Sequence, residues 1–332
     1  MTASSDLVLT LATYDHDRVS ALFDGRVTVP GCHLDCVAES TSLLFPLSVG
    51  EARFDITEVS LSSYLMQISR GEGAYWALPV YLSRAFRHGG IYVRRDAGIS
   101  EPRDLEGKAV GVPEYQMTAA VWMRGILRDE YGVRIDQIQY HTGALDSGRR
   151  DERLPLVLPD SMDVQPISPG ENLNAMLLDG RLDAILAPSP PGSFLAQDRR
   201  ICRLFADYGT LERAYYRKTG FFPIMHLAAV RKSLVEDHPW LPMRLYSAFL
   251  EARDLALGRL EAVWRGSSNR LSLPWLHTDY EATRELMGEN VWSYGLEANR
   301  AELDAFCRYS HEQHLSTRRL TPDELFHPSL LG

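Results

Sequence analysis

Short apolar runs and longer amphipathic stretches alternate along the first hundred residues of the chain. This pattern predicts short strands at residues 7–12, 31–37, 55–59 and 91–93. Residues 41–50 and 62–69 have the pattern of helices that connect such strands. Because strands and helices alternate in this order, the pattern indicates an α/β fold.

A new strand and helix unit begins after a short capped turn at residues 100–107. The pattern predicts a strand at 108–112 and an amphipathic helix at 116–131. Further elements are expected downstream, namely strands at 138–141 and 184–187 and a helix at 172–178. Residues 141–169 are rich in Pro, Gly, Asp and Arg, a composition typical of long connections that contact ligands.

The last third of the chain is predominantly helical in pattern. Residues 221–230 form one more apolar run. The sequence Asp237-His238-Pro239 then starts a helix, because proline suits the first helical turn, and this helix extends to about residue 260. Two more helices are expected at 280–287 and 300–311.

Composition and charge are those of a soluble globular protein. The 332 residues include 35 basic and 44 acidic side chains, which gives a net charge of −9, and 45% of the residues are apolar. At ~150 residues per domain, this length predicts about two domains. Lys and Arg are scattered rather than clustered, which argues against a nucleic-acid partner but is compatible with a small anionic ligand.

Targeting segments and cysteines add two expectations. The chain has neither the apolar run of ~7–15 residues typical of a signal peptide nor a membrane span of ~18 residues, so we expect a cytoplasmic protein with no membrane partner. The cysteines lack the spacing of a zinc site and are expected to be reduced thiols; they are Cys32, Cys36, Cys202 and Cys307.

Several motifs resemble known families. Residues 54–58 (Phe-Asp-Ile-Thr-Glu) and 104–112 (Asp-Leu-Glu-Gly-Lys-Ala-Val-Gly-Val) resemble the type 2 periplasmic-binding-protein fold. Three further motifs are similar to 4,5-dihydroxyphthalate decarboxylases, which are built on that fold: residues 84–88 (Arg-Ala-Phe-Arg-His), 112–119 (Val-Pro-Glu-Tyr-Gln-Met-Thr-Ala) and 219–226 (Thr-Gly-Phe-Phe-Pro-Ile-Met-His).

The resemblance implies two α/β lobes around a ligand cleft and a helical C-terminal region. Residues 1–100 and 226–332 are expected to form the first lobe and residues 101–225 the second, with chain crossings near 97–104 and 215–230. The implied activity is that of a carboxy-lyase, which removes CO2 non-oxidatively from a hydroxylated aromatic acid such as 4,5-dihydroxyphthalate. The number of carboxylates on the substrate stays open, because Ser189 stands where an arginine is common in the family.

This chemistry requires a proton donor. Direct loss of CO2 from an arene would leave a carbanion in the ring plane, so the ring carbon must be protonated first. The catalytic candidates are His226, His88 and Glu114, because histidine titrates near neutral pH and both histidines and the glutamate lie in the matching motifs. A core position for His226 and a loop position for His88 are the structural alternatives.

Arginines are the candidates for binding the carboxylate, since a guanidinium can form two parallel hydrogen bonds with it. Arg84 and Arg87 lie in a matching motif, and Arg149 begins a second basic cluster with Arg150 and Arg153, which is expected to be largely solvated. The other candidate substrate contacts lie at predicted strand ends and at the start of the second-lobe helix; they are Tyr14, Asp15, Ser60, Tyr115 and Thr118. Ordinary helix capping is the alternative for the last two.

Two other functions fit the same pattern. A solute-binding protein of this fold would capture an aromatic acid without chemistry, although the missing export signal argues against it. A metal-dependent decarboxylase would need ligands that show no metal-binding spacing; they would come from His88, His226, His141, Glu58 and Asp15. We expect no organic cofactor and a small aromatic acid as partner, while a divalent metal and a homo-oligomer stay open alternatives.

Overall fold

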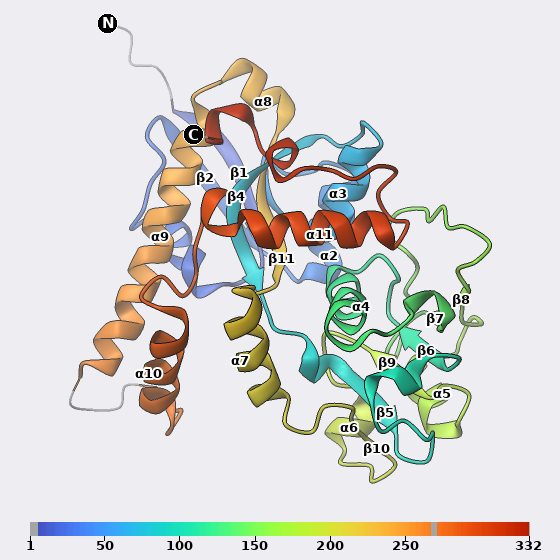
Figure 1. The fold of residues 1–332 in the computed structure, drawn as a ribbon. Coiled ribbons are helices and arrows are strands. Elements are labelled where there is room, and N and C mark those ends of the chain that lie inside the picture. The colour runs from blue at the N-terminus through green and yellow to red at the C-terminus, as the bar shows by residue number, and fades with distance from the viewer. Residues whose placement is uncertain (1–5, 267–270, 332) are drawn as a thin grey trace, which may run out of the picture.

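The chain folds into two α/β lobes, each built around its own sheet (Figure 1). The structure is a computed structural model that describes residues 6–266 and 271–331. The first sheet has the strand order β2-β1-β3-β11-β4, and the second has the order β10-β5-β9-β6-β7-β8. The predicted α/β class is therefore confirmed.

The first sheet contains β1 (Leu7–Thr13), β2 (Cys32–Ala38), β3 (Ile56–Ser60), β4 (Tyr75–Arg84) and β11 (Ile224–Arg231). β1 pairs in parallel with β2 and β3, whereas β11 runs antiparallel to β3 and β4. β11 therefore lies inside the sheet, although residues 85–223 separate it from β4 in the chain. The sequence pattern did not predict β4. This strand contains Pro79, which an edge strand tolerates because its outer N–H groups need no partner in the sheet.

The second sheet contains β5 (Ile91–Arg94), β6 (Ala109–Val112), β7 (Gln139–Thr142), β8 (Val164–Pro166), β9 (Ala184–Leu186) and β10 (Ile201–Arg203). β6 pairs in parallel with β7 and β9, and β8 extends this parallel set beside β7. β5 runs antiparallel to both β9 and β10. The carboxyl ends of the parallel strands lie at one edge of the sheet, which is where α/β folds place ligands.

Two connections join the lobes. The first runs from Arg84 to Ile91, and the second runs from Arg203 to Ile224 and includes α7 (Tyr208–Thr219). Phe86 of the first connection stacks on Phe222 of the second, with ring centroids 4.8 Å apart. The first crossing therefore precedes the predicted position at 97–104. The reason is that β5 pairs with β9 and β10, which places it in the second sheet rather than in the first lobe.

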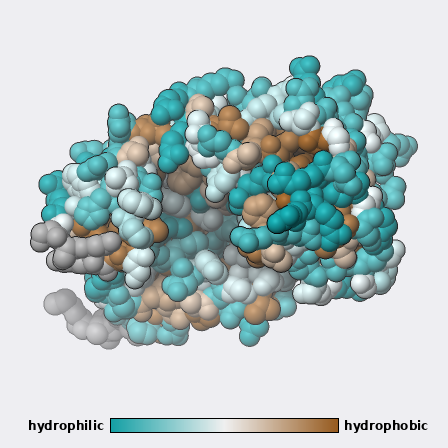
Figure 2. All heavy atoms as spheres, turned by 90° about the horizontal axis from the view of Figure 1, so that it is seen from below, coloured by the Kyte–Doolittle hydropathy of each residue, from teal (hydrophilic) through white to brown (hydrophobic). Residues whose placement is uncertain are grey.

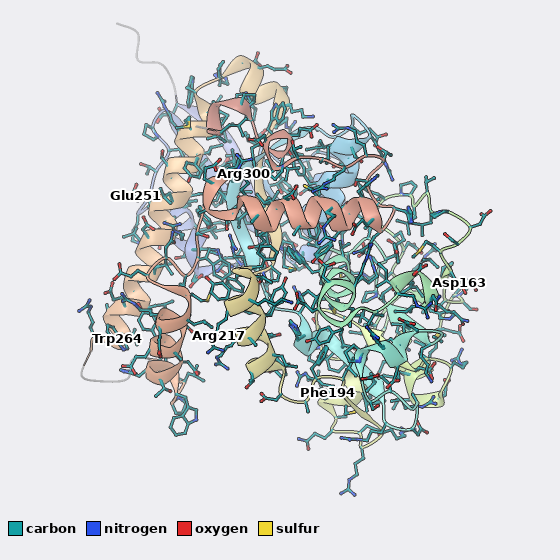
Figure 3. The ribbon with its side chains drawn as sticks, in the orientation of Figure 1. Asp163, Phe194, Arg217, Glu251, Trp264 and Arg300 are labelled. Atoms are coloured by element: carbon teal, nitrogen blue, oxygen red, sulfur yellow. The ribbon has the colours of Figure 1, made fainter. Side chains whose placement is uncertain are left out.

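Helices pack around both sheets. They are α1 (Ser20–Phe23), α2 (Thr41–Phe45), α3 (Leu61–Ser69), α4 (Thr118–Tyr131), α5 (Leu173–Asp179), α6 (Gly192–Leu195), α7, α8 (Lys232–Asp237), α9 (Leu241–Trp264), α10 (Leu276–Met287) and α11 (Arg300–Glu312). The helix predicted at 41–50 divides into α2 and a π-helical turn at Pro46–Gly50. Figure 3 labels Trp264 where α9 ends beside α10. Within the described residues, none of the helices is long and apolar enough to cross a membrane.

One hydrophobic core joins the two lobes. It includes Leu11 of β1, Val110 of β6, Trp122 of α4 and Phe306 of α11. The Trp122 ring lies 5.2 Å from the Phe306 ring, and its Nε1–H donates to the Ile224 carbonyl at 2.9 Å. α11 thus packs against α4 of the second lobe as well as against α3 of the first (Figure 1).

Candidate active site

A cavity of about 290 Å³ lies between the two lobes. Its first-lobe wall consists of Thr41, Phe45, Ser60, Met225 and His226, and Arg87 joins them from the first connection. Its second-lobe wall consists of Pro113, Met117, Thr118, Ala119, Leu145, Arg150, Arg153, Pro188 and Ser189. Seen from below, the molecule is hollowed between the side that carries α9 and α10 and the second lobe (Figure 2).

His226 presents an imidazole to this cavity with one nitrogen already bound to a carboxylate. β11 places His226 opposite Ser60 of β3, and Nδ1 of His226 lies 2.6 Å from Oε1 of Glu58. Glu58 is fully buried, whereas 19% of the His226 side chain is exposed. Phe45 packs edge-on against the imidazole, with ring centroids 4.8 Å apart. Because an ionised carboxylate only accepts, Nδ1 is the donor and Nε2 is the nitrogen left for a ligand.

Three donors surround the Glu58 carboxylate. The backbone N–H of Tyr14 donates to Oε2 at 2.9 Å, and Nε2 of His16 lies 3.1 Å from both oxygens. Burial alone would raise the pKa of Glu58, but the hydrogen bonds with His16 and His226 outweigh it and hold that pKa well below its usual range. Burial lowers the pKa of His226, and the charge of Glu58 opposes this shift. Glu58 is therefore an ionised carboxylate that orients His226.

Arg87 brings an unpaired positive charge to the same cavity. Its Nε is buried without a hydrogen-bond partner, and none of the described carboxylates forms an ion pair with the guanidinium. Burial lowers the pKa of Arg87 to about 10, with the charge of Glu212 opposing the shift, so the group is charged at neutral pH. A buried charge without a partner is destabilising, and a bound carboxylate would offset that cost.

Hydroxyl groups of both lobes meet at the cavity wall. Ser60 Oγ lies 2.9 Å from Thr118 Oγ1, which also accepts the N–H of Ser62 at 3.1 Å. Thr118 is the first residue of α4, and its neighbours Met117 and Ala119 line the cavity as well. The N-terminal end of α4 therefore faces the cavity, and its free N–H groups favour a negative charge there.

A second pair of arginines lines the cavity from the second lobe. Arg150 and Arg153 bind the same oxygen of Glu114 at 2.6 and 3.0 Å. The other oxygen of Glu114 is buried without a partner. Both arginines also border an adjoining outer cavity of about 590 Å³, which Glu114 and Arg149 line too. Two guanidinium groups against one carboxylate leave a net positive charge on this wall.

Sequence comparison identifies the family. The chain is 39% identical to the 4,5-dihydroxyphthalate decarboxylase of Comamonas testosteroni over 327 residues, which cover 98% of each protein. The chain belongs to the 4,5-dihydroxyphthalate decarboxylase family. A relative of the same name from Pseudomonas putida is 35% identical over 215 residues, covering 65% of this chain and 83% of that protein. No family profile matches the chain.

The fold of this decarboxylase-family chain is shared with periplasmic binding proteins. The periplasmic aliphatic sulphonate binding protein of Escherichia coli has a TM-score of 0.56 at 12% identity, covering 98% of this chain and 99% of that protein. Protein AF1704 of Archaeoglobus fulgidus has a TM-score of 0.52 at 17% identity, covering 95% and 100%. At these identities the likeness concerns the fold alone, and it confirms the predicted two-lobed architecture.

Four of the eleven predicted site residues line the central cavity of this decarboxylase-family chain: Ser60, Arg87, Thr118 and His226. Glu114 and Arg149 line the outer cavity instead. Glu114 is held by Arg150 and Arg153 as an acceptor, which does not suit it to donate a proton. Arg149 has a side chain that is 86% exposed and paired with an aspartate. Glu114 therefore does not lie where a proton donor to a substrate in the central cavity would lie, and Arg149 does not line the central cavity as a carboxylate anchor would.

Arg84 does not face the cavity. Its side chain is 3% exposed and forms an ion pair with Glu302 at 3.3 Å. It also donates to Asn299 and to the carbonyls of Phe222 and Ser293. The prediction that Arg84 binds the substrate carboxylate is therefore wrong. Its guanidinium is occupied by residues of the C-terminal region, mainly Glu302 and Asn299.

His88 also lies outside the cavity. Its ring packs edge-on against Tyr131, Phe205 and Tyr215, with centroids 5.4 to 6.2 Å away. Burial lowers the pKa of His88 to about 4, so this imidazole is neutral at physiological pH. The aromatic rings around His88 disfavour its charged form. The prediction that His88 transfers a proton to the substrate is therefore wrong, because its ring is neutral and does not line the cavity.

The remaining predicted contacts lie near the cavity but do not line it. Tyr14 and Asp15 are exposed at the end of β1. Tyr14 donates its N–H to Glu58, and its ring packs edge-on against His16 with centroids 5.4 Å apart. Tyr115 is fully buried, with the Arg124 guanidinium 3.8 Å from its ring. Its position before α4 places it in the core of the second lobe rather than at the cavity.

The sequence did not reveal the pairing of Glu58 with His16 and His226. The sequence suggested Glu58 only as one possible ligand of a metal ion, and it suggested no role for His16. One signal was present: an acidic residue interrupts the buried strand β3, whose parallel neighbour β1 ends three residues before His16. A charge in such a strand needs a partner, and the loop after β1 is the nearest source.

The described residues contain no group of three His, Cys, Asp or Glu side chains arranged to hold a metal ion. Glu58, His16 and His226 converge, but the ring nitrogens that face the carboxylate already take part in hydrogen bonds with it. Two of the alternative ligands lie elsewhere, since Asp15 is exposed and His88 is enclosed by aromatic rings. Asp15 and His88 therefore do not join Glu58 and His226 in one ligand set.

Proposed function

We propose that this chain removes CO2 from a hydroxylated aromatic carboxylic acid of the 4,5-dihydroxyphthalate type. The sequence identity to the decarboxylase of Comamonas testosteroni gives the reaction class. The observation that carries the proposal is the pairing of His226 with buried Glu58 beside the unpaired Arg87, in one cavity. This arrangement supplies a proton carrier and a carboxylate anchor at the same place.

The proposed reaction proceeds through a protonated ring. A hydroxyl group of the substrate loses its proton, and its oxygen electron pair moves into the ring as the carbon that bears the carboxylate takes a proton. The bond from this carbon to the carboxylate then breaks, CO2 leaves, and the bonding pair restores the aromatic ring. The hydroxyl proton returns, so the net change is replacement of the carboxylate by hydrogen. The substrate ring accepts the electrons, and the reaction therefore needs no organic cofactor.

His226 is the proposed proton donor. Its Nδ1 is bound to Glu58, so Nε2 carries the proton toward the substrate. The Glu58 carboxylate stabilises the charged imidazole and fixes the orientation of the ring. The partial exposure of His226 allows the ring to be reprotonated after each turnover.

Arginines on two walls are the proposed anchors for the substrate anion. Arg87 faces the cavity from the connection between the lobes, while Arg150 and Arg153 face it from the second lobe. Ser189 stands where an arginine is common in the family, but these three arginines supply positive charge to the same cavity. Ser60, Thr118 and the N-terminal end of α4 are the proposed partners of the substrate hydroxyl, because they favour a phenolate.

The test is a decarboxylation assay with a panel of hydroxylated benzoates and phthalates, measuring CO2 release. In D2O, the product should carry deuterium at the carbon that lost CO2. His226→Asn should lower kcat by ~10²–10⁴-fold with little change in binding. His33→Asn is the matched control, because His33 is 68% exposed on β2 and does not line the cavity. Tight binding of aromatic acids without CO2 release would replace this proposal with a solute-binding function.

A further inference from the structure

A second histidine, His16, shares the Glu58 carboxylate with His226. Nε2 of His16 lies 3.1 Å from both oxygens of Glu58, while Nδ1 of His226 lies 2.6 Å from one of them. Either histidine could in principle carry the proton that the proposed reaction consumes. The groups on the far side of the His16 ring decide between them.

Arg18 lies on that far side in a fixed position. Its Nε and Nη2 atoms both donate to the Leu82 carbonyl of β4, at 2.7 and 2.5 Å. The Trp292 ring covers its guanidinium at 3.9 Å, and Asp17 pairs with Nη1 at 2.9 Å. Only 14% of the Arg18 side chain is exposed. These contacts hold Nη2 in place, 2.8 Å from Nδ1 of His16.

Arg18 and Glu58 together determine which nitrogen of His16 carries its hydrogen. Nη2 carries two hydrogens, one for the Leu82 carbonyl and one for Nδ1 of His16. A guanidinium only donates, so Nδ1 must accept with its lone pair and carries no hydrogen. The single ring hydrogen of His16 is then on Nε2, where it donates to Glu58.

We infer that Arg18 fixes His16 as a neutral donor to Glu58, which makes His16 a positioning residue and leaves His226 as the histidine that exchanges protons. A proton added to Nδ1 of His16 would point at the guanidinium of Arg18 and would be repelled. His226 has no such neighbour on its own element; it is faced by Glu58, His16 and Arg87, and its Nε2 is open to the cavity. The role of His226 rests on the proposed function, but the tautomer of His16 does not.

Nuclear magnetic resonance of the ¹⁵N-labelled full chain tests the tautomer directly. At neutral pH, His16 should show a hydrogen-free Nδ1 and a hydrogen-bearing Nε2. Arg18→Met should leave the hydrogen on Nε2, which faces Glu58, but should allow Nδ1 to carry a hydrogen as well. Arg26→Met should change nothing, because Arg26 pairs with Asp24 on the surface. A hydrogen on Nδ1 of His16 in the unsubstituted chain would overturn the inference, whether or not the chain is a decarboxylase.

A pair of His16 substitutions tests the positioning role. Glutamine can accept from Arg18 through its oxygen and donate to Glu58 through its nitrogen, whereas leucine can do neither. His16→Gln should lower kcat/KM by less than about 10-fold, and His16→Leu by more, because a general acid that loses its orientation loses about 10²-fold.

The pH profile separates positioning from simple loss of structure. Without the bond from His16, the charge of Glu58 interacts more strongly with His226, so in His16→Leu the loss of kcat/KM should occur at a higher pH. His16→Gln should keep the profile of the unsubstituted chain. If His16→Gln loses activity as completely as His226→Asn while the fold is retained, His16 is the proton donor and the inference is wrong. If His226→Asn stays active, His226 is not the proton donor, while the tautomer assignment stands. If the unsubstituted chain releases no CO2, the proposed function fails and the tautomer assignment again stands.

Discussion

Arg84 and Arg87 lie in the same motif, three residues apart, yet the structure gives them opposite environments. Arg84 is paired with Glu302 and donates to three further acceptors, which are Asn299 and the carbonyls of Phe222 and Ser293. Arg87 has no carboxylate partner among the described residues and faces the cavity between the lobes. The Nε atom of each arginine is buried without a hydrogen-bond partner, so the difference lies in the outer nitrogens. A guanidinium whose outer nitrogens bind a buried carboxylate and backbone carbonyls supports the fold, while one that no carboxylate pairs with is available to a ligand.

The largest effect is expected for the stability of Arg84→Met. This substitution leaves the Glu302 carboxylate in the core without its counter-ion, a loss that costs about 3–5 kcal/mol. Urea unfolding should show a free energy of unfolding lower by this amount, with Arg26→Met as an exposed control. If the free energy of unfolding were unchanged, Arg84 would not be the structural member of the pair.

Arg87→Met should affect ligand binding rather than stability. Removing a charge-assisted contact to a desolvated carboxylate costs about 2–5 kcal/mol, which would raise KM for substrates that carry the carboxylate. The free energy of unfolding should not fall, because no protein partner is lost and a buried charge without a carboxylate partner is removed. Titration calorimetry with an aromatic acid measures the first effect. Equal affinities for the variant and the unsubstituted chain would contradict the ligand-binding role of Arg87.

The two arginines should also differ in their effect on the pH profile. His226 must be protonated to act as an acid, so kcat/KM falls as pH rises through a pKa that burial holds below the ordinary value for histidine. The positive charge of Arg87 contributes to this lowering. In Arg87→Met the fall should therefore occur at a higher pH, whereas in Arg84→Met it should not move. A matching shift in both variants would mean that the profile reports general loss of structure.

The smallest effect is expected for Arg149→Met. Arg149 is 86% exposed and its partner Asp151 is 66% exposed, so this pair contributes less than about 1 kcal/mol to stability. Because Arg149 lines only the outer cavity, KM should change much less than in Arg87→Met. Parallel assays of the two variants check this ranking. A KM effect as large as that of Arg87→Met would place the substrate in the outer cavity.

The sequence predicted the positions of helices and strands more accurately than it predicted which strands pair with one another. The alternation of strands and helices led to the α/β class, and β1, β3 and α4 lie within a few residues of their expected positions. β4 was missed because Pro79 interrupts its apolar run, and β5 was assigned to the wrong sheet because its pairing depends on β9 and β10. Local pattern contains no information about which distant strand will be a neighbour.

The same limit explains the mixed outcome at the candidate site. Arg84 and Arg87 are indistinguishable in sequence, since the residue that pairs with Arg84 lies 218 positions later. His226 was found through its motif, whereas Glu58, which orients it, is 168 positions away. The second histidine that binds Glu58, His16, follows a different strand, β1. Residue type suggested the chemistry, but tertiary contacts decide which residue of each type can perform it.

The position of β11 has a consequence for how the chain reaches its folded state. β4 pairs with no strand of the first sheet except β11, and β3 keeps one open edge until β11 arrives. During synthesis from the N-terminus, residues 85–223 must therefore be made while β4 has no strand to join and β3 is unprotected on one side. Contacts between such distant segments form slowly, and exposed strand edges favour association between chains. The nascent first lobe is thus most vulnerable to aggregation until β11, which ends at Arg231, has emerged from the ribosome.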